Sequence, residues 1–100
     1  MKTFNTKLAI ALLEEARVNI ESGKNIFICW ALEAISSGDT EKERTVVKIK
    51  EWMFIQLGGK VFTYGDWLNS NYPEKSSEYL EDMRSGRIVW IDAMIEELRK

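Results

Sequence analysis

The side chains of this sequence that could do acid–base chemistry are carboxylates, because the chain has no histidine. This absence excludes the usual general base, the usual nitrogen ligand for zinc, and Ser/His and Cys/His nucleophile pairs. Acidic pairs stand at Glu14/Glu15, Glu78/Asp82 and Glu96/Glu97. General acid–base catalysis needs one carboxyl group removed from water and a second in a polar setting, both facing one cleft. Since these pairs fall on polar helix faces, the sequence predicts no enzyme activity and no catalytic residues.

Two other carboxylates and the single cysteine stand in apolar surroundings. Glu33 and Asp92 each lie within a short apolar run, and an arginine such as Arg87 is the expected partner of either one. Cys29 is the only cysteine, so an internal disulfide is excluded. It lies in "IFICWAL" with no basic neighbour in the sequence, which predicts a buried, unreactive thiol.

Metal and phosphate sites lack their usual spacing. The chain has no cluster of ligand residues at metal-binding spacing, and "LGGKVFTYG" matches neither common phosphate-loop fingerprint. We therefore predict no metal and no cofactor.

Aromatic residues are numerous for a chain of this length. The tryptophans stand in apolar helical stripes at Trp30, Trp52, Trp67 and Trp90. Stacking platforms for nucleic acid are interleaved with Lys and Arg, so we expect these tryptophans in the core instead. Other aromatic residues exceed what a small core needs, and tyrosine and arginine are common interface anchors. The predicted partner-binding residues are Phe62, Tyr64, Tyr72, Tyr79, Arg84 and Arg87.

The segment "EKERTVVKIK" is the most basic part of the chain. Its cations are Lys42, Arg44, Lys48 and Lys50. The interleaved glutamates favour an exposed helix whose ion pairs lie three and four residues apart. The later segment "TYGDWLNSN", placed where a recognition helix would stand, has no Lys or Arg to read bases. A nucleic-acid-binding regulator that uses Lys42 to Lys50 is therefore the alternative function, and nucleic acid is the disfavoured partner.

The spacing of apolar residues in the first half of the chain is helical. A helix is predicted from Thr6 to Glu21, capped by Asn5 or Thr6 and ended by Gly23. The run around Cys29 to Ile35 is apolar on all sides and predicts a short buried helix, with strand and helix both open for Ile26 to Ile28. Thr40 and Glu43 have the form of a capping box for the next helix.

The second half of the chain continues the helical pattern. A two-turn helix is predicted to carry Trp67 and Leu68 inward before Pro73. The last segment is predicted to have Ser76 or Ser77 as its cap and to run as one long helix or as two short ones with a break at Gly86. The fold class is therefore all-α, a compact bundle of four to six short helices with a long C-terminal helix.

Composition and length indicate one helical domain over residues 1–100. The hydrophobic fraction of 45% and the charged fraction of 30% are those of a globular chain. A formal charge of −2 gives neither a basic face for nucleic acid nor the acidity of a DNA mimic. No apolar stretch reaches the roughly 20 residues that span a bilayer, and no signal peptide is evident. We expect no membrane partner and a cytoplasmic location.

The order of four motifs resembles that of small phage and prophage proteins of uncharacterised function. These motifs are "IFICWAL", "EWMFIQL", "DWL" and "GRIVWIDAMIEEL", and together they cover residues 10 to 98. The resemblance implies a bacterial host cell and binding to a host protein or complex, such as a defence nuclease, because small phage proteins commonly act by blocking host enzymes. The leading hypothesis is thus a stoichiometric protein-binding module that inhibits a bacterial defence enzyme or another host enzyme, in an anti-CRISPR-like or host-takeover role. A homodimer through the apolar face of the last helix is a further expectation.

Overall fold

Apolar residues at helical spacing fold into six α-helices in the computed structural model, which describes residues 4–25, 27–56 and 64–100, with the side chains at 64–66, 80 and 83 left aside. The helices are α1 (Thr6–Glu21), α2 (Ile28–Ser36), α3 (Thr40–Gln56), α4 (Tyr64–Asn71), α5 (Ser76–Glu81) and α6 (Met83–Arg99). No strand occurs in these ranges. The predicted all-α class with a long C-terminal helix is confirmed.

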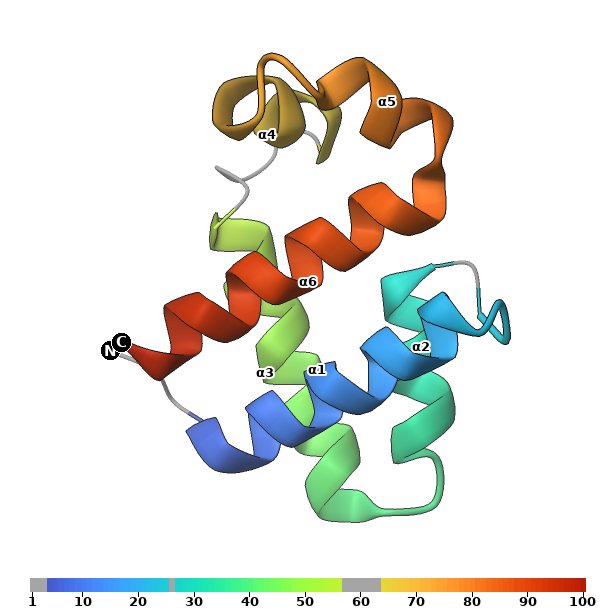
Figure 1. Cartoon of the computed structure of the whole chain (residues 1–100). Helices are drawn as coiled ribbons and strands as arrows, with labels where there is room; N and C mark the ends of the chain where they lie inside the picture. The colour runs from blue at the N-terminus through green and yellow to red at the C-terminus, as the bar shows by residue number, and fades with distance from the viewer. Residues whose placement is uncertain (1–3, 26, 57–63) are drawn as a thin grey trace.

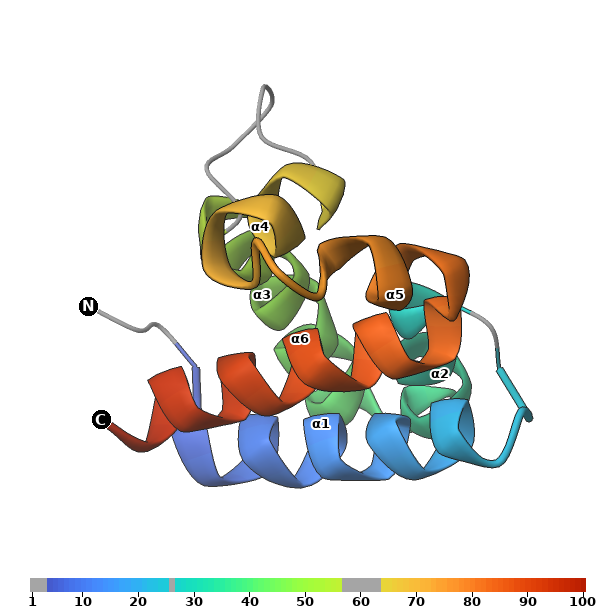
Figure 2. The ribbon, with the colours of Figure 1, turned by 45° about the horizontal axis from the view of Figure 1, so that its top comes forward.

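The first and last helices form the centre of the fold. α1 and α6 lie antiparallel and side by side, and they make the most extensive contact between any two helices (Figures 1 and 2). α2 and α3 pack against α1. α5 packs against α6, and α4 packs against α5. The apolar face of α6 is therefore covered within the chain, by its own first helix.

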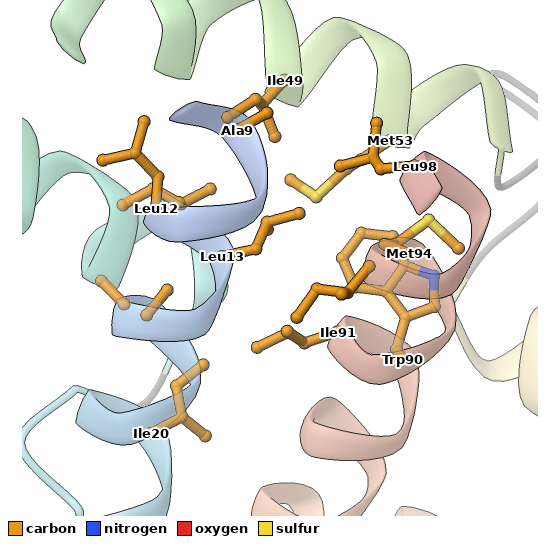
Figure 3. Close-up of a cluster of buried hydrophobic side chains, with 14 of the residues drawn as sticks. Ala9, Leu12, Leu13, Ile20, Ile49, Met53, Trp90, Ile91, Met94 and Leu98 are labelled. Atoms are coloured by element: carbon orange, nitrogen blue, oxygen red, sulfur yellow. The ribbon is translucent and has the colours of Figure 1, made fainter. Parts of the chain in front are cut away.

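The core lies between α1, α3 and α6. α1 contributes a stripe at three- and four-residue spacing, including Leu12, Leu13 and Ile20, none of which is more than 1% exposed (Figure 3). Ile49 and Met53 of α3 close one side of the core, and α6 closes the other. The buried residues of α6 are Trp90, Ile91, Met94, Ile95 and Leu98. For α1, the stripe that the sequence indicates is thus the face that is buried.

Capping side chains set the ends of the first helices. The Asn5 side chain accepts a hydrogen bond from the Leu8 backbone N–H (3.2 Å), and the chain leaves α1 through Gly23 at φ 81°. The predicted capping box at Thr40 is displaced by one residue. Asp39 accepts from the Lys42 N–H (3.0 Å), and Glu43 accepts from the Gly38 N–H (3.0 Å).

The last two helices meet at Asp82. Its backbone, at φ −98° and ψ 86°, ends α5, and its side chain caps α6 by accepting from the Ser85 N–H (3.3 Å) and the Ser85 hydroxyl (2.7 Å). Gly86 is buried inside α6, so the break left open at that glycine falls four residues earlier. The expected cap at Ser76 or Ser77 was wrong, because α5 starts after Lys75 without a side-chain cap.

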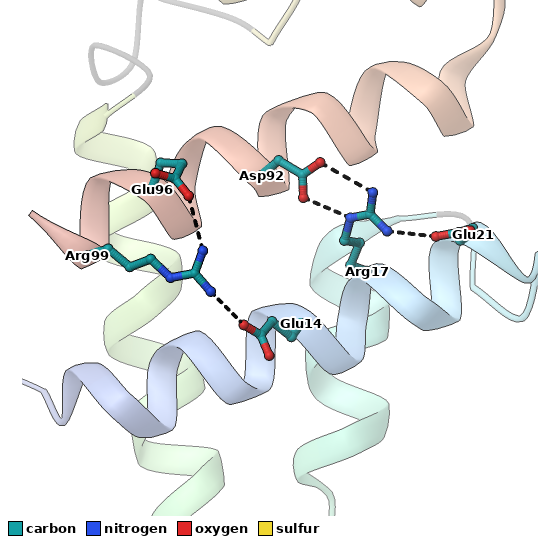
Figure 4. A network of polar contacts seen from close by, with 6 residues as sticks. All are labelled: Glu14, Arg17, Glu21, Asp92, Glu96 and Arg99. Carbon is teal, nitrogen blue, oxygen red and sulfur yellow. Dashed lines mark hydrogen bonds and ion pairs between the residues drawn. The ribbon is translucent and has the colours of Figure 1, made fainter.

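Two arginines join α1 to α6 across their exposed edge (Figure 4). Arg17 donates to both carboxylate oxygens of Asp92 (2.8 and 3.3 Å) and to Glu21 (2.7 Å). Arg99 donates to Glu14 (3.1 Å) and to Glu96 (3.0 Å). The Asp92 hydrogen bond is the main reason that the pKa of Arg17 is raised. Asp92 therefore pairs with an arginine, but with Arg17 and not with Arg87.

Candidate functional site

A pocket of about 330 Å³ opens between the N-terminal end of α2, the C-terminal half of α3 and the first half of α6. Its lining residues are Phe27, Ile28, Cys29, Lys50, Met53, Phe54, Arg87 and Trp90. Met53 and Trp90, both labelled in Figure 3, are at most 4% exposed and belong to the core. The pocket is thus an opening on the edge of the hydrophobic core, with a volume in the range of ligand and anchor sites.

Large aromatic side chains surround this pocket and remain in contact with water. Phe27, Phe54 and Trp30 are 41%, 47% and 56% exposed. Trp30 packs edge-on against Phe27 with ring centroids 4.8 Å apart, so it stands directly beside the pocket. We call the pocket together with Trp30 the α2–α3 face. A contiguous exposed apolar surface on a small soluble domain is typical of an interaction site.

Both charged side chains that line the pocket are cations. Lys50 donates to Glu33 across the seam between α2 and α3 (2.6 Å), and this hydrogen bond raises the pKa of Lys50. The expected arginine partner of Glu33 was therefore wrong. The guanidinium of Arg87 lies over the Phe27 ring, 4.9 Å from its centroid, in a cation–π contact.

The predicted partner-binding residues with described side chains do not form one surface. Tyr72 and Tyr79 pack on each other with centroids 5.7 Å apart, and Tyr72 also packs on Trp67 (5.8 Å). This half-buried row joins α4 to α5, so these tyrosines have a packing role. Phe62 and the Tyr64 side chain lie outside the described residues.

The two predicted arginines lie on one helix but have different surroundings. Arg84 is exposed, and its guanidinium lies close to Gly23, just after the C-terminal end of α1. A Cβ atom added at Gly23 would be 3.2 Å from this guanidinium. Arg87, one turn later, lines the pocket. Among the predicted partner-binding residues whose side chains the structure describes, Arg87 lies on the α2–α3 face.

The cations predicted for nucleic-acid binding are divided between two sides of α3. Lys50 faces α2 and pairs with Glu33. Arg44 and Lys48 line a separate hollow together with Phe4 and Glu41. Lys42 is half-buried. The four side chains thus do not form a single basic patch.

Two predictions of burial were wrong. Cys29 is exposed, since it lies on the side of α2 that faces the pocket. Trp30 is exposed beside it, whereas Trp67 and Trp90 are buried in the core as expected and Trp52 is half-buried. Because α2 has only nine residues, its buried side is filled by Ala31, Leu32 and Ser36.

The α2–α3 face could have been located from two runs of the sequence. "IFICW" and "WMFI" are apolar at four or more successive positions. Successive helical residues point in different directions, about 100° apart, so such a run cannot be buried on one side of a helix. The excess over one stripe is what the structure exposes: Phe27 and Trp30 in the first run, Phe54 and Ile55 in the second.

No group of His, Cys, Asp and Glu that could hold a metal ion occurs among the described residues. Within the same ranges, no helix is long and apolar enough to cross a membrane. No protein-family model matches the chain, and the comparisons with curated proteins and with solved structures likewise give no match.

Proposed function

We propose that this chain is a small protein-binding module that docks on its target through the α2–α3 face. The observation that supports the proposal is the set of exposed aromatic side chains around an apolar pocket at the edge of the hydrophobic core. Aromatic residues and arginine are enriched at the centre of protein interfaces, and an apolar pocket gives a partner side chain a site that excludes water. The face thus has the composition of an interface.

The resemblance of "GRIVWIDAMIEEL" and the three earlier motifs to small phage proteins also indicates which class of protein the target belongs to. We infer a stoichiometric inhibitor of a bacterial host enzyme, such as a defence nuclease, acting in the host cytoplasm. Inhibition by occupancy needs no catalytic group in the inhibitor, because a bound surface alone can exclude a substrate. No specific observation favours the nucleic-acid regulator, since Lys50 is paired and Arg44 and Lys48 lie on another side of α3.

The test is affinity capture of the tagged protein from bacterial lysate, with and without nuclease, using variants matched for chemistry. Trp30→Glu and Phe54→Glu place a charge on the α2–α3 face. Val18→Glu makes the same kind of change on α1, at an apolar side chain that is 61% exposed and does not line the pocket. We expect a nuclease-resistant stoichiometric protein to be captured by the wild type and by Val18→Glu, and to be lost with both face variants.

Two results would contradict the proposal. A partner captured equally by all variants would bind elsewhere on the chain. Retention of nucleic acid, lost on nuclease treatment and falling steeply with salt, would instead support the regulator.

A further inference from the structure

The two cations of the α2–α3 face differ in whether a carboxylate neutralises them, and this difference indicates what the face binds. Lys50 is already neutralised by Glu33 at 2.6 Å. Among the described residues, no carboxylate forms an ion pair with Arg87, which instead contacts the Phe27 ring. Arg87 therefore carries the positive charge that remains available at the pocket.

The contact between Arg87 and Phe27 leaves a specific part of the guanidinium available. The guanidinium is planar and carries its five N–H donors along its edge, and a contact with an aromatic ring does not use these donors on an oxygen acceptor. Such an edge can bond to a carboxylate through two parallel hydrogen bonds. Because the ring already restricts the arginine, less conformational entropy is lost when the acid binds.

From these observations we infer that the partner segment places an apolar side chain in the pocket and an adjacent Asp or Glu against Arg87. The inference rests on the proposed function and adds the chemistry of the partner. Arg87 is then the residue that determines specificity, while the exposed side chains of Phe27 and Phe54 supply affinity when the partner removes their apolar surface from water. A basic segment would be rejected at the same place by like charge.

The experiment uses a random peptide library displayed on ribosomes and selected on immobilised full-length protein. Wild type, Arg87→Glu and Arg84→Glu are selected in parallel. The last variant is the matched control, because Arg84 is an exposed arginine one turn earlier on α6 and does not line the pocket. We expect the peptides selected by wild type and by Arg84→Glu to carry an aromatic or aliphatic residue next to Asp or Glu. The peptides selected by Arg87→Glu should carry the same kind of residue next to Lys or Arg.

A double-mutant cycle then measures the coupling between Arg87 and the acid of the peptide. The affinities of a fluorescein-labelled peptide from the wild-type selection and of its Glu→Gln or Asp→Asn form are measured by fluorescence anisotropy. Arg87→Gln should lower the affinity for the acidic peptide about fivefold, which is the upper end of the effect of a partly exposed ion pair. The affinity for the neutral peptide should not change. Arg84→Gln should change neither peptide. Circular dichroism of each variant checks that the fold is intact.

Three results would overturn the inference: peptides without an acidic excess, an acidic excess that Arg87→Glu does not reverse, or peptides whose binding survives Phe54→Glu. Dimerisation of the purified protein that Phe54→Glu abolishes, seen by sedimentation, would make a second copy the occupant and would also overturn it. Lysate capture separates this failure from failure of the proposed function. If capture still depends on Trp30 and Phe54, the α2–α3 face binds protein and only the acidic partner is wrong.

Discussion

Asp82 combines two structural roles in one residue, since its backbone ends α5 and its side chain caps α6. The hydrogen bonds from Ser85 hold the pKa of Asp82 below its ordinary value of 3.8. A carboxylate whose pKa is lowered on folding stabilises the folded state above its unfolded pKa, and this stabilisation is lost as the pH falls through the folded value. The cap thus weakens in acid.

We predict that Asp82→Asn makes the thermal midpoint less dependent on pH on the acid side. Asparagine is an equally good N-cap but does not titrate in this range. The difference between wild type and variant should be largest above about pH 5 and should shrink below the unfolded pKa near 3.8. Thermal melts followed by circular dichroism from neutral to acidic pH measure it, and parallel curves for the two proteins would show that the cap makes no ionic contribution.

Cys29 gives a second prediction at the residue scale, because its thiol is exposed where a buried one was expected. Iodoacetamide should alkylate it in the native protein at a rate comparable to that in the urea-unfolded chain, as followed by intact mass. Occupancy of the pocket by a selected peptide should slow the native reaction by covering the thiol. A native rate lower by orders of magnitude without any peptide would mean that the thiol is buried.

At the scale of elements, the packing of α1 against α6 supplies most of the core. Leu13 is 0% exposed and lies on the side of α1 that faces Ile91 and Met94 (Figure 3). Leu13→Ala should destabilise the fold by about 3–4 kcal/mol, through lost burial and the cavity left behind. Val18→Ala, on the exposed side of the same helix, should change stability by less than about 0.5 kcal/mol. Urea denaturation compares the two, and equal losses would place the core elsewhere.

The helices themselves could be predicted from the sequence where one apolar stripe was clear. α1 is the best case, because its cap at Asn5, its stripe and its stop at Gly23 all follow from local chemistry. The start of α3 was misplaced by one residue because Asp39 and Thr40 are both good caps, and side-chain geometry decides between them. The α5–α6 boundary depends on Asp82, whose role is visible only once Ser85 has been placed.

The candidate site was harder to predict than the helices. The sequence identifies Arg87, but it does not distinguish Phe27, Trp30 and Phe54 from core residues, because each of them stands in an apolar run. The number of these apolar side chains that can be buried in the core depends on the sizes of the neighbouring helices. A nine-residue helix packed on one side can bury only part of an all-apolar surface.

At the scale of the whole molecule, the described chain has the dimensions of a single domain. Its Cα radius of gyration is 13.2 Å, close to the value of about 13 Å expected for 100 residues. Because the apolar side of α6 is covered by α1, we predict a monomer in solution at micromolar concentration, against the dimer through the last helix that its sequence suggested. Small-angle scattering over a concentration series measures this, and a radius that rises with concentration would contradict it.

The pairing of α1 with α6 also constrains when the chain can fold during its synthesis. α1 completes its packing only when α6 has also been made, so the main interface joins residues that are far apart in sequence. While the ribosome still holds α6, the stripe of α1 that carries Leu12 and Leu13 cannot be fully covered. A growing chain therefore shows apolar surface to chaperones until α6 has left the ribosome, and products that stop before α6 become substrates for proteolysis.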